Sequence, residues 1–163
     1  MNILVTGGAG YIGSVTAEAL IQAGHSVTVY DSLVTGHRAA APDGVNFVEA
    51  DLADSHTLVE TFIKNKFDAV MHFAAFIEAG ESMKDPGRFY QNNFTNAITL
   101  AETAVRAGVK RFVLSSTAAV FQSSEEPLNE ESPLGPTNVY GHTKLMVEQA
   151  LEVGEVIRKP VRR

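Results

Sequence analysis

The chain has 163 residues, of which 45% are hydrophobic and 20% are charged, and its formal net charge is −6. This length and balance are typical of one globular domain, and the negative charge argues against nucleic acid as a partner. The sequence has no cysteine, which excludes disulfides and thiolate metal sites, and no apolar run reaches the roughly 18 residues that a membrane helix needs.

Short apolar runs rich in β-branched residues alternate with segments of helical spacing along the chain. We expect strands at residues 3–6, 26–30, 45–49, 69–73 and 111–114, and helices at residues 11–23, 55–65, 92–107 and 139–153. Residues 37–44 and 123–138 are expected to be loops. Because parallel neighbours need a crossover, the alternation predicts an α/β fold with a doubly wound parallel sheet of about five strands.

The first predicted strand runs into glycines spaced Gly-x-x-Gly-x-x-Gly at Gly7, Gly10 and Gly13. Such glycines allow a tight turn, a close approach of the backbone to a pyrophosphate, and close packing of helix on strand. The free amides and the positive dipole at the helix start favour the same anion. In this position the pattern predicts a Rossmann dinucleotide site, although a glycine-rich turn without a ligand is the alternative.

Acidic residues follow the second and third predicted strands. Asp31, eighteen positions after Gly13, can accept hydrogen bonds from the ribose hydroxyls of adenosine, which favours NAD over NADP. Arg38 nearby keeps NADP open as an alternative. Asp51 and Leu52 are expected to receive the adenine, and a role of Asp51 as a helix cap is an equal alternative.

A phenol and an ammonium lie four positions apart at Tyr140 and Lys144, on one face of the last predicted helix. This spacing is common in ordinary helices, so the argument for chemistry rests on context, with Ser115 and Thr117 ending the preceding strand at the sheet edge where ligands bind. An ordinary phenol ionises near pH 10, and an adjacent ammonium favours the phenolate. Tyr140 is therefore expected to act as a base. Oxygens of Thr137 or Asn138 are expected to cap the helix.

These motifs, with the segment at residues 72–75, resemble the extended short-chain dehydrogenase/reductase family over residues 1–151. Segments 80–82, 90–93 and 144–148 are most similar to UDP-glucose 4-epimerases. The resemblance implies UDP-glucose/UDP-galactose interconversion through a 4-keto intermediate, with Thr117, Tyr140 and Lys144 catalytic and His72 packed. It implies NAD bound by Gly7, Gly10, Tyr11, Ile12, Gly13, Asp31, Ser32, Thr35, Gly36, Asp51, Leu52, Phe73, Ala74, Ala75, Asn93, Ser115, Tyr140 and Lys144.

Some positions depart from related sequences. Nucleotide-sugar 4,6-dehydratases typically place Asp-Glu after the threonine, where this chain has Ala118 and Ala119, which favours an epimerase over a dehydratase. A reductase or dehydratase acting on another nucleotide sugar is a further alternative. Phe121 and Gln122 stand where the family often has Tyr-Gly. Ile77 stands where some epimerases have a lysine near the pyrophosphate, so weaker NAD binding is expected.

The sequence continues only a short way after Leu151, whereas members of the family continue into a sixth strand and a substrate-binding lobe. We therefore expect residues 1–163 to form a dinucleotide-binding domain truncated after the last helix, with impaired turnover of a UDP-sugar substrate. A non-catalytic NAD-binding module is the alternative. The resemblance and the broad apolar surface of helix 92–107 predict a homodimer through helices 92–107 and 139–153. No export signal is visible, so a cytoplasmic location is expected, and the basic run 158–163 is expected to be a solvated end.

Overall fold

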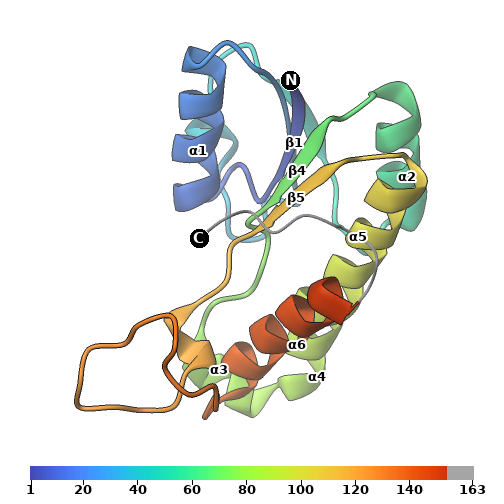
Figure 1. The fold of residues 1–163 in the computed structure, drawn as a ribbon. Helices are drawn as coiled ribbons and strands as arrows, with labels where there is room; N and C mark the ends of the chain where they lie inside the picture. Colours follow the sequence, from blue (N-terminus) through green and yellow to red (C-terminus); the bar gives the residue numbers. More distant parts are fainter. Residues whose placement is uncertain (154–163) are drawn as a thin grey trace.

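The computed structural model describes residues 1–153 and contains one parallel sheet (Figure 1). The strand order is β3-β2-β1-β4-β5, so β1 lies at the centre and β3 and β5 at the edges. All five predicted strands are confirmed, with ends that differ by at most one residue. They are β1 Asn2–Thr6, β2 Ser26–Asp31, β3 Asn46–Glu49, β4 Ala69–His72 and β5 Arg111–Leu114.

Helices cover both faces of the sheet, which confirms the doubly wound architecture (Figure 1). Helix α1 covers one face, α2 and α5 lie on the other, and α3, α4 and α6 group at the end where β4 and β5 lead out. The helices are α1 Tyr11–Gln22, α2 Ser55–Lys64, α3 Ala79–Lys84, α4 Pro86–Phe89, α5 Asn96–Arg106 and α6 Val139–Val153, with short turns η1 Arg38–Ala40, η2 Tyr90–Thr95 and η3 Ala118–Val120.

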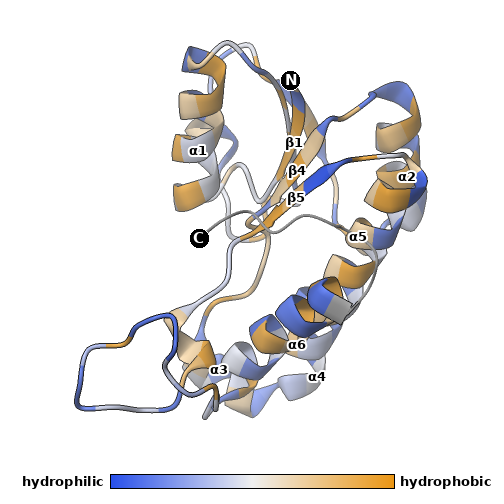
Figure 2. Ribbon diagram, viewed as in Figure 1, coloured by the Kyte–Doolittle hydropathy of each residue, from blue (hydrophilic) through white to orange (hydrophobic). Residues whose placement is uncertain are grey.

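The alternation of side chains along the strands divides the core into two layers. On the face of α2 and α5, Leu4 and Val70 are fully buried and pack in one cluster with Phe112. On the face of α1, Val5 and Val29 are fully buried with Ala17 of the helix. Strands covered on both faces are largely apolar, which explains the apolar runs in the sequence (Figure 2).

The segment between β4 and α5 differs from expectation. The structure has α3, α4 and the π-helical turn η2 where only a regular helix from residue 92 was predicted. Helices of six and four residues are too short to show a 3.6-residue period, although Asp85 caps α4 with Pro86 at its start. The π-helical turn also shifts the register of the apolar positions ahead of α5.

The two predicted loops are confirmed apart from the short turn η1. The loop before α6 is mostly hydrophilic (Figure 2), and a single bridge between Phe121 and Leu134 closes its base. The predicted basic end at residues 158–163 lies outside the described residues. No helix within residues 1–153 combines the length and apolar character required to cross a membrane.

Candidate functional site

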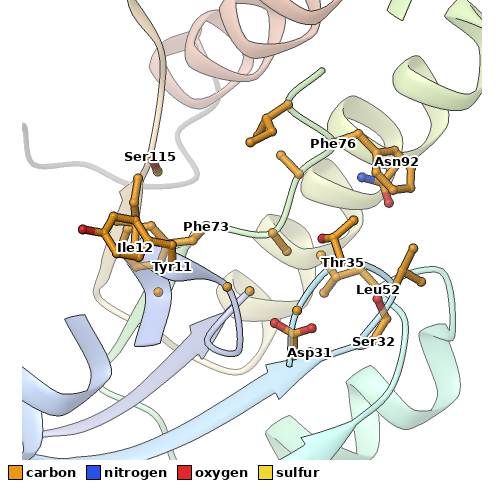
Figure 3. A pocket seen from close by; sticks show the side chains of 18 of the residues that line it. Tyr11, Ile12, Asp31, Ser32, Thr35, Leu52, Phe73, Phe76, Asn92 and Ser115 are labelled. Carbon is orange, nitrogen blue, oxygen red and sulfur yellow. The ribbon is translucent and has the colours of Figure 1, made fainter. Parts of the chain in front are cut away.

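A cleft of about 470 Å³ opens at the carboxyl ends of the strands, where the strand order reverses between β1 and β4 (Figure 3). Ligands of doubly wound sheets bind at this switch point, because crossovers on opposite faces leave a crevice there. The volume is within the range of small-molecule sites. Tyr11, Ile12 and Ser115 lie on one side of the view, and Asp31, Thr35 and Leu52 on the other.

The turn between β1 and α1 admits only glycine at two positions. Gly7 has a φ of +73°, and a Cβ there would lie 2.5 Å from the backbone nitrogen of Ala74. A Cβ at Gly13 would lie 2.1 Å from the carbonyl oxygen of Gly7. No side chain caps the first turn of α1. Its first residues line the cleft, and their amides, left without a side-chain cap, are available to an anion.

Asp31 is held rigidly at the end of β2 and is only 8% exposed. One carboxylate oxygen accepts from the amide of Ala9 at 2.9 Å and the other from the amide of Leu33 at 2.9 Å. Arg38, which kept NADP open in the sequence, stacks on the ring of Phe47 with its guanidinium carbon 4.2 Å from the ring centroid. The carboxylate therefore dominates this end of the cleft.

Beyond Asp31, the cleft is walled by Tyr30 and by the segment that follows β3. The hydroxyl of Tyr30 donates to the carbonyl of Asp51 at 3.0 Å. Burial, together with the charges of Asp54 and Asp51, raises the pKa of Tyr30 to about 12. The cap of α2 is Asp54, which accepts from the amide of Thr57, so the capping role considered for Asp51 is wrong and Asp51 lines the cleft.

The start of α6 is fixed by three contacts. Asn138 accepts from the amide of Gly141 at 2.8 Å, which confirms it as the predicted cap, and Ser82 accepts from the amide of Tyr140 at 3.1 Å. A Cβ at Gly141 would lie 2.3 Å from the carbonyl oxygen of Ala119. Turn η3 and α6 are thus in direct backbone contact, and both Tyr140 and Lys144 line the cleft.

Lys144 is a buried cation that faces the cleft and is 3% exposed. Burial lowers its pKa to about 8, against the opposing effect of Glu148. Nearby, burial and the charge of Lys144 lower the pKa of His72 to about 3, so this ring is neutral. His72 pairs with the hydroxyl of Thr6 at 2.7 Å and is 1% exposed, which supports a packed role.

The charges around the cleft are unbalanced. Lys144 is the one basic side chain among the residues that line it, whereas Asp31, Asp51 and Glu78 are acidic. The hydroxyl oxygen of Ser116 is buried at the cleft without a hydrogen-bond partner. Residues 1–153 contain no group of histidine and acidic side chains arranged to hold a metal ion. A negatively charged ligand here depends on backbone amides, and a buried hydroxyl is left for a ligand to satisfy.

All but two of the predicted site residues line this cleft. Thr117 does not, since its hydroxyl accepts from the amide of Ala119 at the start of η3. Asn93 does not, since its amide lies behind the wall while Asn92 faces the cleft. Sequence reasoning missed several lining residues, and most of them directly adjoin predicted ones, so extending each predicted segment by one residue would have found Tyr30, Val34, Ala50, Phe76, Asn92 and Ser116. Glu78 also lines the cleft, as does Ile77, which the sequence placed near the pyrophosphate without counting it as a binding residue.

Comparison with known proteins finds one family model, described as the NAD dependent epimerase/dehydratase family, over residues 3–154. The chain is 44% identical to a UDP-glucose 4-epimerase of Lacticaseibacillus casei over 157 residues, 96% of this chain and 47% of that protein. A UDP-glucose 4-epimerase from Brucella ovis in complex with NAD aligns with a TM-score of 0.88 at 41% identity, covering 93% of this chain and 46% of that one. A Bifidobacterium longum epimerase in complex with NAD⁺ and UDP aligns with a TM-score of 0.88 at 32% identity, covering 93% of this chain and 48% of that one. The chain spans about half the length of the relatives it matches.

Proposed function

The chain belongs to the NAD-dependent epimerase/dehydratase family, and we propose that it is the cofactor-binding part of a UDP-sugar 4-epimerase that interconverts UDP-glucose and UDP-galactose. One observation carries the proposal. The glycine turn, Asp31, Tyr140 and Lys144, which lie far apart in the sequence, line a single cleft.

NAD fits the residues that are present. Gly7 and Gly13 permit a turn so tight that any side chain at either position would collide with the backbone, and the uncapped start of α1 offers amides to the pyrophosphate. The fixed carboxylate of Asp31 can accept from ribose hydroxyls. The unpartnered hydroxyl of Ser116 also lines the cleft, where a polar group of the cofactor would satisfy it.

The chemistry proposed for the chain's own residues is the transfer of one proton from and to the sugar hydroxyl. When bound, NAD supplies reversible oxidation of an alcohol to a ketone at C4 of the sugar. Tyr140 takes the hydroxyl proton and later returns it, and Lys144, one helical turn further along α6, lines the same cleft. Thr117 is proposed to hydrogen-bond the same sugar oxygen through its proton, since only its oxygen is used within η3.

Two side chains support an epimerase over a dehydratase. Elimination of water needs acid and base groups beside the sugar, and the residues after Thr117 are Ala118 and Ala119, which carry no titratable group. In an epimerase the hydride removed from the sugar is returned to it, so we expect no net redox change. Formation of a 4-keto-6-deoxy product, or net accumulation of NADH, would favour the dehydratase or reductase alternatives.

We also propose a homodimer formed through α5 and α6 with the turn before α5. Phe94 and Ile98 on one segment, and Leu145 and Met146 on the other, are only half buried in the single chain. Pairing of two copies would bury this apolar surface. Sedimentation at micromolar concentration should give twice the chain mass of 17.5 kDa, and a monomer at that concentration argues against the interface.

The decisive experiment is an epimerase assay with UDP-galactose and NAD. We expect conversion that is lost in Tyr140→Phe while NAD binding is kept, because only the phenolic oxygen is removed. The second candidate is an NAD-binding module without turnover, which the cleft supports because it suffices to hold the dinucleotide. NAD binding without conversion in the unaltered chain would select that candidate, and absence of NAD binding would reject both.

A further inference from the structure

The end of β2 carries two consecutive cleft residues whose side chains lie on opposite faces of the sheet. Asp31 holds the glycine turn through the amide of Ala9. Tyr30 lies on the face of α2 and α5, is 1% exposed, and packs in one core cluster with Leu52 and Leu58. Tyr30 therefore belongs both to the core and to the wall of the cleft.

The hydroxyl of Tyr30 bonds to the segment between β3 and α2. It donates to the carbonyl oxygen of Asp51 at 3.0 Å, and the same oxygen accepts from the amide of Asp54 at 3.0 Å. A backbone carbonyl oxygen has two lone pairs, so this one is fully used. Burial, with the charges of Asp54 and Asp51, raises the pKa of Tyr30 to about 12, so the hydroxyl keeps its proton at neutral pH.

The carboxylate of Asp51, by contrast, has acceptor positions left for a ligand. One of its oxygens accepts from the amide of Ala53 at 2.8 Å, and Asp51 is exposed and lines the cleft. An ionised carboxylate offers about four lone-pair positions. The acceptor that Asp51 presents to a ligand is therefore its carboxylate, which favours a ligand group that donates protons.

The position of this carboxylate depends on β2. Strand β3 lies at one edge of the sheet, and its neighbour in the sheet is β2. Where β3 ends, the amide of Ala50 donates to the carbonyl of Asp31 at 3.1 Å and continues the pairing by one residue. The bond from Tyr30 to Asp51 is the next attachment along the chain. Figure 3 shows Leu52, which follows, on the same side of the cleft as Asp31.

We propose that Tyr30 is a positioning residue that fixes residues 50–52 beside β2 and thereby sets the preference of the cleft for adenine. The exocyclic amine of adenine donates protons and suits the carboxylate of Asp51, whereas hypoxanthine presents a carbonyl oxygen at the same position. The assignment rests on the proposed function in one respect, that NAD is the ligand of the cleft. Tyr30 acts through Asp51, because its one hydroxyl proton is already used.

Tyr30→Phe tests this role by removing the hydroxyl and keeping the ring. We expect the dissociation constants of NAD and of ADP-ribose to rise about threefold to tenfold, the effect of losing a buried hydrogen bond. Nicotinamide mononucleotide, which lacks the adenosine half, should bind the variant and the unaltered chain equally. Calorimetry measures the first two ligands, and ligand-observed NMR measures the third.

Nicotinamide hypoxanthine dinucleotide, in which a carbonyl replaces the amine of adenine, tests the base preference. The unaltered chain should bind NAD about tenfold more tightly than this analogue, and the ratio should fall about threefold in Tyr30→Phe. In the Asp51→Asn background, adding Tyr30→Phe should leave the ratio unchanged, because the carboxylate through which the tyrosine acts is gone. A residue that only stabilised the fold would change the unfolding free energy and leave the ratio as it is.

A further readout needs no ligand. The amides of Ala53 and Asp54 both donate to Asp51, so their hydrogen exchange reports how firmly that residue is held. In Tyr30→Phe these two amides should exchange about threefold to tenfold faster, because Asp51 loses its attachment to β2.

The matched control is Thr28→Val. Thr28 lies two residues before Tyr30 on the same face of β2, is 3% exposed, and does not line the cleft. Its hydroxyl accepts from the side-chain amide of Asn46, at the start of β3, at 3.0 Å. The substitution therefore removes a bond between the same two strands at their other end, and it should leave all ligand affinities and the exchange of Ala53 and Asp54 unchanged.

The proposal is overturned if Tyr30→Phe leaves the ADP-ribose affinity, the base preference and the exchange of Ala53 unchanged. It is also overturned if nicotinamide mononucleotide weakens by the same factor, or if Thr28→Val has the same effects. Failure of the unaltered chain to bind either NAD or ADP-ribose would instead reject the proposed function, while the exchange of Ala53 in Tyr30→Phe would still show whether the tyrosine holds Asp51.

Discussion

Buried polar residues around the cleft carry a cost in the ligand-free chain. Lys144 is 3% exposed, and its lowered pKa means that burial opposes its charged form. The unpartnered hydroxyl of Ser116 adds a second desolvated group. Groups that destabilise the empty site and become satisfied on binding are expected at a functional cleft, because the ligand then provides their interactions.

Lys144→Met tests this cost through the pH dependence of stability. Between pH 8 and 10.5 the unfolded chain keeps a proton that the folded chain releases from Lys144, so stability rises with pH in that window. From pH 7 to 9 the unaltered chain should gain roughly 1 kcal/mol relative to Lys144→Met. At pH 7 the variant should be the more stable by roughly 1–3 kcal/mol.

Urea unfolding at pH 7 and pH 9 measures the free energy of unfolding of the unaltered chain and of Lys144→Met. Lys64→Met, at an exposed site, is the control. Parallel pH profiles of the unaltered chain and Lys144→Met would contradict the assignment.

Ile77→Lys tests the shortage of positive charge in the cleft. Ile77 is 65% exposed and lines the cleft, where Lys144 is the one basic residue among those lining it. A lysine there should tighten NAD binding about twofold to fivefold at low salt, and the gain should shrink at high salt as the charges are screened. Met83→Lys places the same charge on an exposed position of α3 that does not line the cleft, so calorimetry should find its NAD affinity unchanged. Equal effects from both variants would indicate general electrostatics.

At the scale of elements, the sequence predicts those parts that show a regular hydrophobic pattern or a recognisable turn or cap motif. Strands buried on both faces gave continuous apolar runs, and the glycine turn and Asn138 cap had local signatures. Helices α3 and α4 had too few residues to show a period. In the π-helical turn, Asn93 makes tertiary bonds to Phe76 and Thr143, which no local pattern encodes. The prediction chose the correct segment, but Asn92 lines the cleft where Asn93 was expected to do so.

The contact between η3 and α6 makes Gly141 an element-scale test. A methyl group there would lie 2.3 Å from the backbone oxygen of Ala119 and 2.9 Å from Pro136, so one element must move. Gly141→Ala should destabilise the chain by about 1–3 kcal/mol and weaken NAD binding. Gly80→Ala in α3 has open space around the new methyl group and should stabilise by up to about 1 kcal/mol. Chemical denaturation distinguishes the two. A neutral Gly141→Ala would show that the contact is not rigid.

At the scale of the whole molecule, the described residues line one cleft, and the chain spans about half the length of the matching epimerases. Each of the central strands contributes a loop to that cleft, so ligand binding ties together segments separated by most of the chain. A ligand that binds only the folded state stabilises all of them together. Global stability is thus a direct measure of cofactor choice, independent of turnover.

NAD and NADP should differ sharply in this measure. At one hundred times its dissociation constant, NAD should add about 2.7 kcal/mol of stability and raise the melting temperature by roughly 5–10 °C. NADP at the same concentration should raise it much less, because its 2′-phosphate would face the carboxylate of Asp31, while Arg38 is stacked on Phe47. Asp31→Asn should narrow the difference by removing the charge, whereas Asp43→Asn, outside the cleft, should leave it unchanged. Equal shifts from the two cofactors in the unaltered chain would contradict the role of Asp31, because discrimination would then depend on neither its charge nor the position of Arg38.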